Sequence, residues 1–331
     1  MDWLYHRGVF DFDAMTDLNK KLREYLNQNC SLEIAAATQT QTSSDGTIKW
    51  VIDQGQAQAI ETVYIPEKSR STLCVSSQIG CLIDCPFCAT GHQGFNRNLS
   101  SAEIIGQVLL AKQALKQELK QDHAITNIVF MGMGEPLANF SETIKAIKIL
   151  TDPNGFNLSR RRVTISTSGL VPQIMKLADY VNVSLAVSLH APVNKLRDEL
   201  VPINRRHPIE ALLDACWFYA KNGRLKTVTF EYTLLKGIND QPQHARQLCK
   251  LLKDRPAKVN LIPFNPFPGI AYQPTPVYQI NEFRNILLES GIMTMTRTTR
   301  GDDIKAACGQ LSGMVNNLAK QSLGQKLKTI N

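Results

Sequence analysis

From Thr72 onward, short apolar segments alternate with longer amphipathic ones, and this alternation constrains the fold more than any other feature of the sequence. The apolar segments are rich in β-branched residues, as strands are, and the amphipathic segments have the three- and four-residue spacing of helices. The expected strands are TLCVSSQ, TNIVFMG, RVTISTS, VNVSLAVS, TVTFEYTLL, KVNLIPF and IMTMTRT. The expected helices include SAEIIGQVLLAKQALKQELK, FSETIKAIKIL, IEALLDACWFYAKN and INEFRNILLESG.

Strands and helices in this order are typical of βαβ units, which form a parallel sheet with right-handed crossovers. Six or seven units indicate a full or partial α/β barrel, whose functional groups lie at the carboxyl ends of the strands. A doubly wound sheet is the alternative fold. Before the barrel, residues 1–28 predict one or two short helices, and residues 31–66 predict a small β-meander with a turn at 43–46. Residues 308–331 predict a closing helix.

Composition narrows the class of protein. The 331 residues suit one barrel with an appendage. The excess of 37 Lys and Arg over 29 Asp and Glu gives a net charge of +8, which favours a polyanionic partner without establishing one. The sequence contains no apolar run near the ~18 residues of a membrane span, and its start lacks the pattern of a signal peptide. We therefore expect a cytoplasmic protein without a membrane partner, whose cysteines are thiols or metal ligands before they are structural disulfides.

Three of the eight cysteines follow the first barrel strand with the spacing C-x3-C-x2-C, namely Cys81, Cys85 and Cys88. Three thiolates on one loop can hold three irons of a cubane iron-sulfur cluster and leave the fourth iron open to another ligand. Zinc is the alternative, but it prefers four protein ligands, and Cys74 would then have to be the fourth.

The cysteine spacing, with Phe87 before the last cysteine, resembles the signature of radical S-adenosylmethionine enzymes. The wider sequence resembles the dual-specificity adenine-C2 RNA methyltransferases of the RlmN family from about residue 2 to about residue 315. The resemblance rests on CVSSQIGCLIDCPFCATGHQGFNRNL, VFMGMGEPLANF, RRVTISTSG, SLHAP, VPINRR, NLIPFNPFPG and TRGDDIKAACGQLSG. It implies a partial (β/α)6-type barrel over 70–303, a small N-terminal α+β accessory region over 1–69, and a C-terminal catalytic cysteine segment with a closing helix over 304–331. Members of the family usually begin with a longer helical module, so the accessory region is expected to be short.

The resemblance also implies the cofactors: one 4Fe-4S cluster on Cys81, Cys85 and Cys88, and S-adenosylmethionine, with two molecules used per turnover. From the residues alone, Gly134 and Glu135 fit either an ordinary turn after a strand or a carboxylate facing the methionine ammonium group. His190 alone is equally typical of a structural histidine. The family's contacts to S-adenosylmethionine correspond to Gly134, Glu135, Ser166, Ser188, Leu189, His190 and Asn265.

Methylation of carbon 2 of adenine poses a chemical difficulty, because this carbon is electron-poor and does not attack a sulfonium methyl group. The resemblance implies that Cys308 first takes a methyl group from S-adenosylmethionine. A radical derived from a second molecule then removes hydrogen from that methyl group, and the resulting methylene radical adds to carbon 2. Glu61 then accepts the carbon 2 proton, and Cys74 attacks the Cys308 sulfur, which leaves a transient disulfide. From the residues alone, Glu61 could equally be an exposed carboxylate at a strand edge, Cys74 a buried strand thiol and Cys308 a thiol that packs a helix.

The implied substrates are an adenosine in the peptidyl-transferase region of 23S ribosomal RNA and the adenosine 3′ of the anticodon in some transfer RNAs. An electron donor such as a flavodoxin with its reductase is also implied. Two other functions stay open: the related carbon 8 adenine methyltransferase, and a metal-stabilised RNA-binding protein without turnover. Candidates for phosphate contacts around the barrel mouth are Arg160, Arg161, Arg162, Arg205, Arg206, Arg297 and Arg300.

Overall fold

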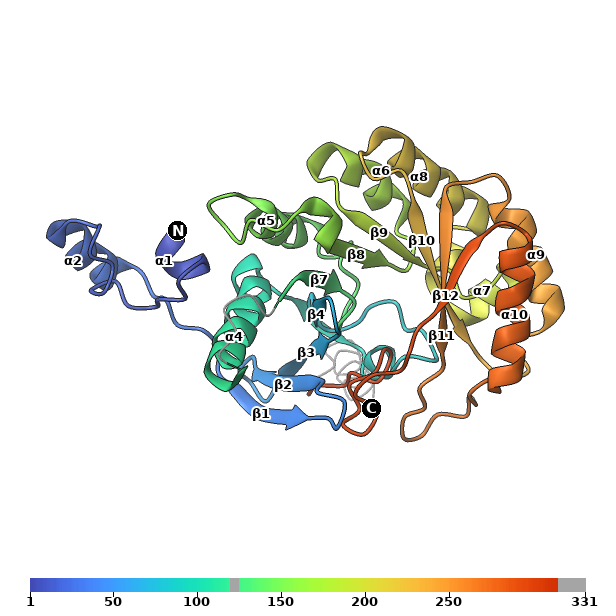
Figure 1. The fold of residues 1–331 in the computed structure, drawn as a ribbon, viewed down its shortest axis with the longest axis horizontal. Helices are drawn as coiled ribbons and strands as arrows, with labels where there is room; N and C mark the ends of the chain where they lie inside the picture. The colour runs from blue at the N-terminus through green and yellow to red at the C-terminus, as the bar shows by residue number, and fades with distance from the viewer. Residues whose placement is uncertain (120–124, 315–331) are drawn as a thin grey trace, which may run out of the picture.

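A ten-stranded sheet runs through the computed structural model, which describes residues 1–119 and 125–314 (Figure 1). Its first three strands are β1 (Ala37–Thr42), β2 (Ile48–Asp53) and β3 (Ala59–Pro66), which pair antiparallel. The turn between the first two is closed by Ser43 N–H donating to Thr47 O at 2.8 Å, and Gly46 has a φ of 82° there. The predicted meander is therefore confirmed.

The meander joins the barrel where β3 pairs antiparallel with β4. From β4 the strands run parallel to their neighbours: β4 (Ser71–Cys74), β7 (Asn127–Phe130), β8 (Val163–Thr167), β9 (Ser184–Ser188), β10 (Val228–Leu234), β11 (Ala257–Pro263) and β12 (Met293–Thr296). Their order across the sheet is their order in the chain. A doubly wound sheet reverses its strand order at a switch point. The sequential order therefore excludes that alternative and confirms a partial barrel, with β12 at one edge.

Helices connect successive parallel strands and cover the outer face of the sheet (Figure 1). The long ones are α4 (Ser101–Leu119), α5 (Phe140–Thr151), α6 (Val171–Tyr180), α8 (Ile209–Asn222), α9 (Pro242–Leu252) and α10 (Val277–Glu289). Two of them, α6 and α9, were not among the helices that the sequence singled out. Both have proline in their first turn, where backbone N–H groups have no acceptor within the helix, so the N–H that proline lacks costs no hydrogen bond. Apolar residues of the strands and helices, such as Ile165, Leu185 and Phe230, are fully buried between the two layers.

Shorter elements surround the barrel. The hairpin of β5 (Gln78–Gly80) and β6 (Phe95–Asn98) brackets α3 (Ala89–His92), and α7 (Asn194–Leu200) with the 3₁₀ turns η1 (Arg160–Arg162) and η2 (Pro202–Arg205) completes the connections. At the N-terminus, α1 (Asp2–Tyr5) and α2 (Lys20–Asn29) project beyond α4 (Figure 1). The helices expected in residues 1–28 are thus present. Within the described residues, the helices include none that is long and apolar enough to cross a membrane.

The closing helix expected over 308–331 is wrong for residues 308–314, and residues 315–331 lie outside the described part of the chain. Gly309 and Gly313 have φ values of 84° and 42°, which interrupt a right-handed helix. Met314 instead exchanges backbone hydrogen bonds with Ala59 at 2.8 and 3.0 Å. This pairing brings the segment that carries Cys308 beside β3.

Candidate active site

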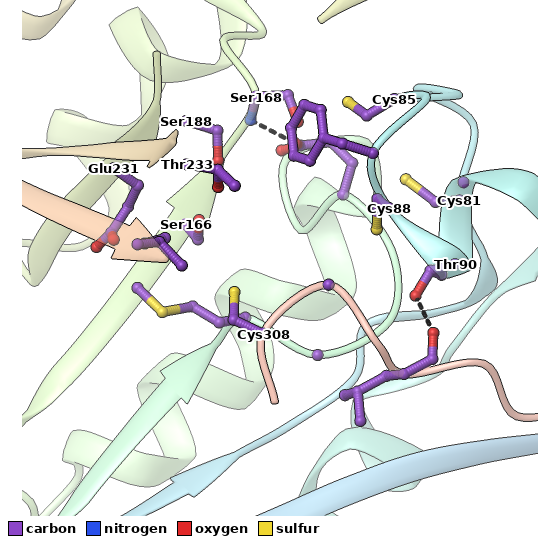
Figure 2. A pocket seen from close by; sticks show the side chains of 18 of the residues that line it. Cys81, Cys85, Cys88, Thr90, Ser166, Ser168, Ser188, Glu231, Thr233 and Cys308 are labelled. Atoms are coloured by element: carbon purple, nitrogen blue, oxygen red, sulfur yellow. Dashed lines mark hydrogen bonds between the residues drawn. The ribbon is translucent and has the colours of Figure 1, made fainter. Parts of the chain in front are cut away.

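A cavity lies at the carboxyl ends of the parallel strands and gathers most of the residues that the sequence indicated (Figure 2). The loop with the three cysteines forms one wall, and the ends of β8, β9 and β10 form the opposite wall. The segment that carries Cys308 lies between them. The candidate residues that line the cavity are Cys81, Cys85, Cys88, Gly134, Glu135, Ser166, Ser188, His190 and Cys308. The placement agrees with the general position of active sites in α/β barrels.

The cysteine loop is shaped by backbone conformations that most residues avoid. Gly80 has a φ of 76°, and a Cβ atom there would lie 2.0 Å from the Gly94 carbonyl oxygen, so only glycine fits. Asp84 also has a positive φ, and Cys88 N–H donates to Cys85 O at 3.1 Å. The resulting tight turn presents three free thiols on one side of the cavity (Figure 2).

The donor set suits an iron-sulfur cluster. Burial raises the pKa of the Cys81 and Cys85 thiols above the ordinary value, so without bound iron these groups stay protonated. Iron bound as a cluster supplies the positive charge that stabilises three thiolates in such a buried place. Cys81, Cys85 and Cys88 would each provide one thiolate to such a cluster.

The zinc alternative needs Cys74 as a fourth ligand. Cys74 is buried on β4, where it pairs with Val63 of β3 and Val129 of β7, and it does not line the cavity wall formed by the cysteine loop. Among residues 1–119 and 125–314, no group of three or more His, Cys, Asp or Glu side chains converges to hold a single metal ion. The described residues therefore do not form the zinc site considered from the sequence.

Glu135, in the turn that follows β7, provides a fixed carboxylate in the cavity lining. It is 2% exposed, and its two oxygens accept hydrogen bonds from the backbone N–H groups of Ser168 at 2.7 Å and Leu137 at 3.1 Å. Gly134 before it has a φ of 99°, where a Cβ atom would lie 2.5 Å from Gln78. Burial raises the pKa of Glu135, although these hydrogen bonds oppose the effect. A cationic ligand group such as an ammonium would stabilise this carboxylate.

His190 is neutral and has a defined tautomer. Its Nδ1 accepts a hydrogen bond from Thr233 N–H at 2.9 Å, so the ring proton lies on Nε2. Burial, helped by the charge of Arg197, lowers its pKa to about 3. The residue has a φ of 57°, and Leu189 before it is fully buried with its N–H bonded to Glu231 O at 3.0 Å. Leu189 therefore contributes backbone shape rather than a side chain to the cavity.

Cys308 is exposed, and its sulfur points into the space between the cysteine loop and Ser166 (Figure 2). Contacts on either side fix its segment: Ala89 N–H donates to Gly309 O at 2.8 Å, and Thr90 Oγ1 donates to Leu311 O at 2.6 Å. Asn265, expected to contact S-adenosylmethionine, donates from Nδ2 to Cys308 O at 3.2 Å and accepts from Thr299 Oγ1 at 3.1 Å. In this structure Asn265 therefore holds the Cys308 backbone.

The second thiol of the candidate pair belongs to Cys74. Burial raises its pKa to about 12, and the nearby charge of Cys308 adds to the effect. Cys308 is exposed as a whole residue, but its thiol lies in the cavity, and desolvation there raises its pKa to about 11. The Arg297 guanidinium lowers the pKa of both thiols against these effects. The charge of Arg297 therefore acts on both thiols, although Cys74 lies outside the cavity lining to which Cys308 and Arg297 belong.

Glu61 lies outside the cavity lining and beside the Cys308 segment. Its Oε1 forms a buried ion pair with Lys49 Nζ at 3.1 Å, and its Oε2 accepts from Ser312 N–H at 2.8 Å. Lys49 also donates to Lys305 O at 3.3 Å. The pair joins the meander to both sides of the segment that carries Cys308, a role that the sequence did not indicate.

The sequence missed Glu231, which lines the cavity and is 3% exposed. Its Oε1 accepts from Arg297 Nη2 at 2.9 Å and from Asn260 Nδ2 at 3.0 Å, while its Oε2 has no hydrogen-bond partner in the described part of the chain. An acidic residue within the apolar strand TVTFEYTLL is costly to bury unless it is paired and hydrogen-bonded, so its presence there indicates a specific role. That signal was available from the sequence.

Only some of the arginines expected around the barrel mouth lie at that end of the barrel. Arg160–Arg162 precede β8 and so lie at its amino end, opposite the cavity, because the turn ends where the strand begins. Arg297 lines the cavity itself, and Arg300 is 3.8 Å from Asp45. Arg205 and Arg206 are exposed after α7.

Comparison with known proteins extends these observations. The family model described as "Radical SAM superfamily" matches residues 75–249, and the one described as "Ribosomal RNA large subunit methyltransferase N-terminal domain" matches residues 1–32. The dual-specificity RNA methyltransferase RlmN of Pseudomonas putida is 52% identical over 324 residues, which cover 97% of this chain and 85% of that protein.

Solved structures agree. A radical SAM methyltransferase from Sphaerobacter thermophilus is 44% identical with a TM-score of 0.88, over 94% of this chain and 90% of that one. SuiB from Streptococcus suis, bound to S-adenosylmethionine, shares the fold at 13% identity and a TM-score of 0.50, over 69% of this chain and 50% of its own. The cysteine loop, the sequential barrel and these similarities lead to one conclusion: the chain belongs to the radical SAM superfamily and, within it, to the RlmN family.

Proposed function

We propose that this protein is an S-adenosylmethionine-dependent RNA methyltransferase that methylates carbon 2 of adenine in 23S ribosomal RNA and in transfer RNA. The observation that carries the proposal is the position of Cys308, whose thiol shares one cavity with Cys81, Cys85 and Cys88. A thiol that can carry a methyl group thus lies beside the ligands of an iron-sulfur cluster. Flavodoxin with its reductase is the class of electron donor that we propose, and the cytoplasm is the proposed location.

Cys81, Cys85 and Cys88 would hold the 4Fe-4S cluster. When bound, the cluster would supply the electron for the reductive cleavage of S-adenosylmethionine. The Glu135 carboxylate, already oriented by Ser168 and Leu137, would bind the amino group of the methionine part. Ser166 and Ser188 at the ends of β8 and β9, with the Leu189–His190 turn, would contact its ribose and adenine. Asn265 would act through the Cys308 carbonyl that it holds.

Cys308 would carry the methyl group. In the first step its sulfur bonds to the methyl carbon of S-adenosylmethionine, the sulfonium–methyl bond breaks and the thiol proton is released. One hydrogen atom of that group would pass to the deoxyadenosyl carbon of a second S-adenosylmethionine, which leaves as 5′-deoxyadenosine. The remaining methylene carbon would then bond to carbon 2 of the adenine, so that RNA and protein are joined through Cys308. A flipped adenine has to reach the cavity for this step.

Glu61 and Cys74 would release the product. Glu61 would accept the carbon 2 proton, and its bond to Ser312 N–H places the carboxylate beside the Cys308 segment. The unpaired electron of the adduct would leave at the same stage to an electron acceptor, a role that the oxidised iron-sulfur cluster would fill. The Cys74 thiolate would attack the Cys308 sulfur, so that a disulfide forms and the carbon–sulfur bond to the product breaks. The electron pair of that bond goes to the methylene carbon, which takes a proton and becomes the methyl group. An external thiol must reduce the disulfide before the next turnover.

Residues 1–69 would form the RNA-binding accessory region, 70–303 the barrel and 304–331 the catalytic cysteine segment. The first of these boundaries falls between β3 and β4, which are paired, so the accessory region and the barrel share one sheet.

Anaerobic reconstitution of the full chain with iron and sulfide tests the proposed function. We expect about four irons per chain, as a cubane cluster requires, and formation of 5′-deoxyadenosine from S-adenosylmethionine only when a reductant is present. Cys85→Ala removes one ligand and should lose both, whereas Cys249→Ala removes a half-buried thiol outside the cavity and should keep both. Purified protein that holds zinc and forms no cluster would contradict the proposal.

A further inference from the structure

Arg197 on α7 is fully buried, which is unusual for a charged side chain. Its guanidinium makes four hydrogen bonds, all to uncharged acceptors. Nε donates to Leu189 O at 3.1 Å, and Nη2 donates to Ser168 O at 2.7 Å and to Ser188 O at 2.9 Å. Nη1 donates to Asn204 Oδ1 at 2.8 Å. The side chain therefore ties together the carboxyl ends of β8 and β9.

The charge of this guanidinium has no bonded counterion. The ion pairs formed within residues 1–119 and 125–314 do not include Arg197. The nearest carboxylate along its hydrogen bonds is Asp198, which accepts from Asn204 Nδ2 at 2.6 Å and so lies one residue away. Burial lowers the pKa of Arg197 to about 10, so the group keeps its proton at neutral pH. A buried cation without a bonded carboxylate is costly to fold, which favours a functional reason for it.

The element that carries Arg197 packs against the cysteine loop. Leu200 and Val201 belong to one apolar cluster with Ile83 and Phe87, and Cys81 and Cys85 pack against that cluster. Arg197 also binds the Leu189 carbonyl, and the ring of the next residue, His190, packs against Phe87 of the cysteine loop with the ring centroids 4.8 Å apart. The guanidinium therefore lies directly behind the wall of the cavity that carries the cluster ligands.

We propose that Arg197 is a positioning residue with two effects: its hydrogen bonds fix the ends of β8 and β9 around S-adenosylmethionine, and its positive charge raises the reduction potential of the cluster on Cys81, Cys85 and Cys88. The cluster gains one negative charge on reduction, and a fixed cation in a buried place stabilises the more negative state. The inference rests on the cluster of the proposed function and does not depend on which RNA is methylated.

The test is a redox titration of the reconstituted full chain with dithionite, without S-adenosylmethionine or RNA, followed by electron paramagnetic resonance. Arg197→Met keeps an unbranched apolar chain and removes the charge. We expect its cluster to be about tenfold less reduced at a given potential, which for one electron is a shift of about 59 mV to more negative values. Arg197→Lys keeps the charge and should keep most of the wild-type potential while binding S-adenosylmethionine more weakly. As the matched control, Arg224→Met removes an exposed charge before β10, at the opposite end of the barrel, and should leave the potential unchanged.

The second variant is a double substitution, Asp198→Asn with Asn204→Asp. It keeps the net charge and moves the carboxylate into direct contact with Arg197 Nη1, so the potential should again become more negative. If Arg197→Met assembles no cluster, the potential of this double variant tests whether the charge of Arg197 raises the reduction potential. A wild-type potential in Arg197→Met, an equal shift in Arg197→Lys, or a wild-type potential in the double variant would overturn the inference. A wild-type chain that assembles no cluster would instead overturn the proposed function.

Discussion

Cys308→Ala is expected to abolish methylation of ribosomal and transfer RNA, and Cys74→Ala is expected to leave RNA covalently attached to the protein. Without the Cys308 thiol the methyl group has no carrier, and carbon 2 of adenine is too electron-poor to take it directly from a sulfonium ion. Without the Cys74 thiol the bond between Cys308 and the RNA still forms, but the proposed attack that breaks it is lost. The expected effects are therefore a complete loss in one variant and a trapped intermediate in the other.

Electrophoresis under denaturing conditions and mass spectrometry of the intact adduct measure both results. The double variant Cys74→Ala with Cys308→Ala should form no adduct, which assigns the attachment to Cys308. Cys249→Ala is the matched control, since its thiol contacts Ile286 O on the outer helices at 3.7 Å and does not line the cavity. Normal turnover by Cys74→Ala would show that the release step has been assigned to the wrong thiol.

Arg297→Gln is expected to slow the first methylation of Cys308 about tenfold at pH 8. The nucleophile in this step is the thiolate. Desolvation of the thiol inside the cavity raises the pKa of Cys308 to about 11, and Arg297 partly offsets this. Since the pKa lies above the working pH, the thiolate fraction rises about tenfold for each pH unit up to the pKa. Loss of the cation raises the pKa further, and one pKa unit corresponds to a tenfold smaller thiolate fraction.

The mass of the Cys308 peptide after incubation with S-adenosylmethionine, across pH 7 to 10 and without RNA, measures this rate. The Arg297→Gln profile should be displaced upward by about one pH unit, whereas Arg297→Lys, which keeps the charge, should stay near the wild-type profile. Arg297 Nη2 donates to Glu231 Oε1 at 2.9 Å, and Arg297→Gln removes this bond. The urea concentration at the midpoint of unfolding therefore checks that the fold of the variant is undisturbed. Superimposable profiles for Arg297→Gln and the wild-type chain would contradict the assigned role of Arg297.

Much of the fold could be predicted because the information is local. The alternation of apolar and amphipathic segments predicts each parallel strand, and the turn at 43–46 predicts the meander. The alternation does not distinguish a partial barrel from a doubly wound sheet, since strand order depends on contacts between distant segments. The closing helix was wrong for 308–314 because Gly309 and Gly313 take positive φ values and Met314 pairs with Ala59.

The site was predictable to a similar extent. Cys81, Cys85 and Cys88 lie within one short loop, so their spacing indicates a shared ligand. The contact between Glu61 and Ser312 spans 251 residues, and the sequence does not indicate that Glu61 holds the Cys308 segment. The role of Arg197 could not be predicted either, because nothing in the helix sequence NKLRDEL distinguishes a buried arginine from an exposed one. Its role follows only from the three strand-end carbonyls that it binds.

The central claim is that this chain places a methyl group on carbon 2 of adenine through Cys308. The most direct measurement is an anaerobic assay of the reconstituted full chain with 23S ribosomal RNA and transfer RNA, followed by mass spectrometry of the digested nucleosides against synthetic standards. We predict 2-methyladenosine from both RNAs, and none when Cys308→Ala is used. Formation of 8-methyladenosine, or no methyladenosine from a chain that carries a complete cluster and forms 5′-deoxyadenosine, would contradict the account.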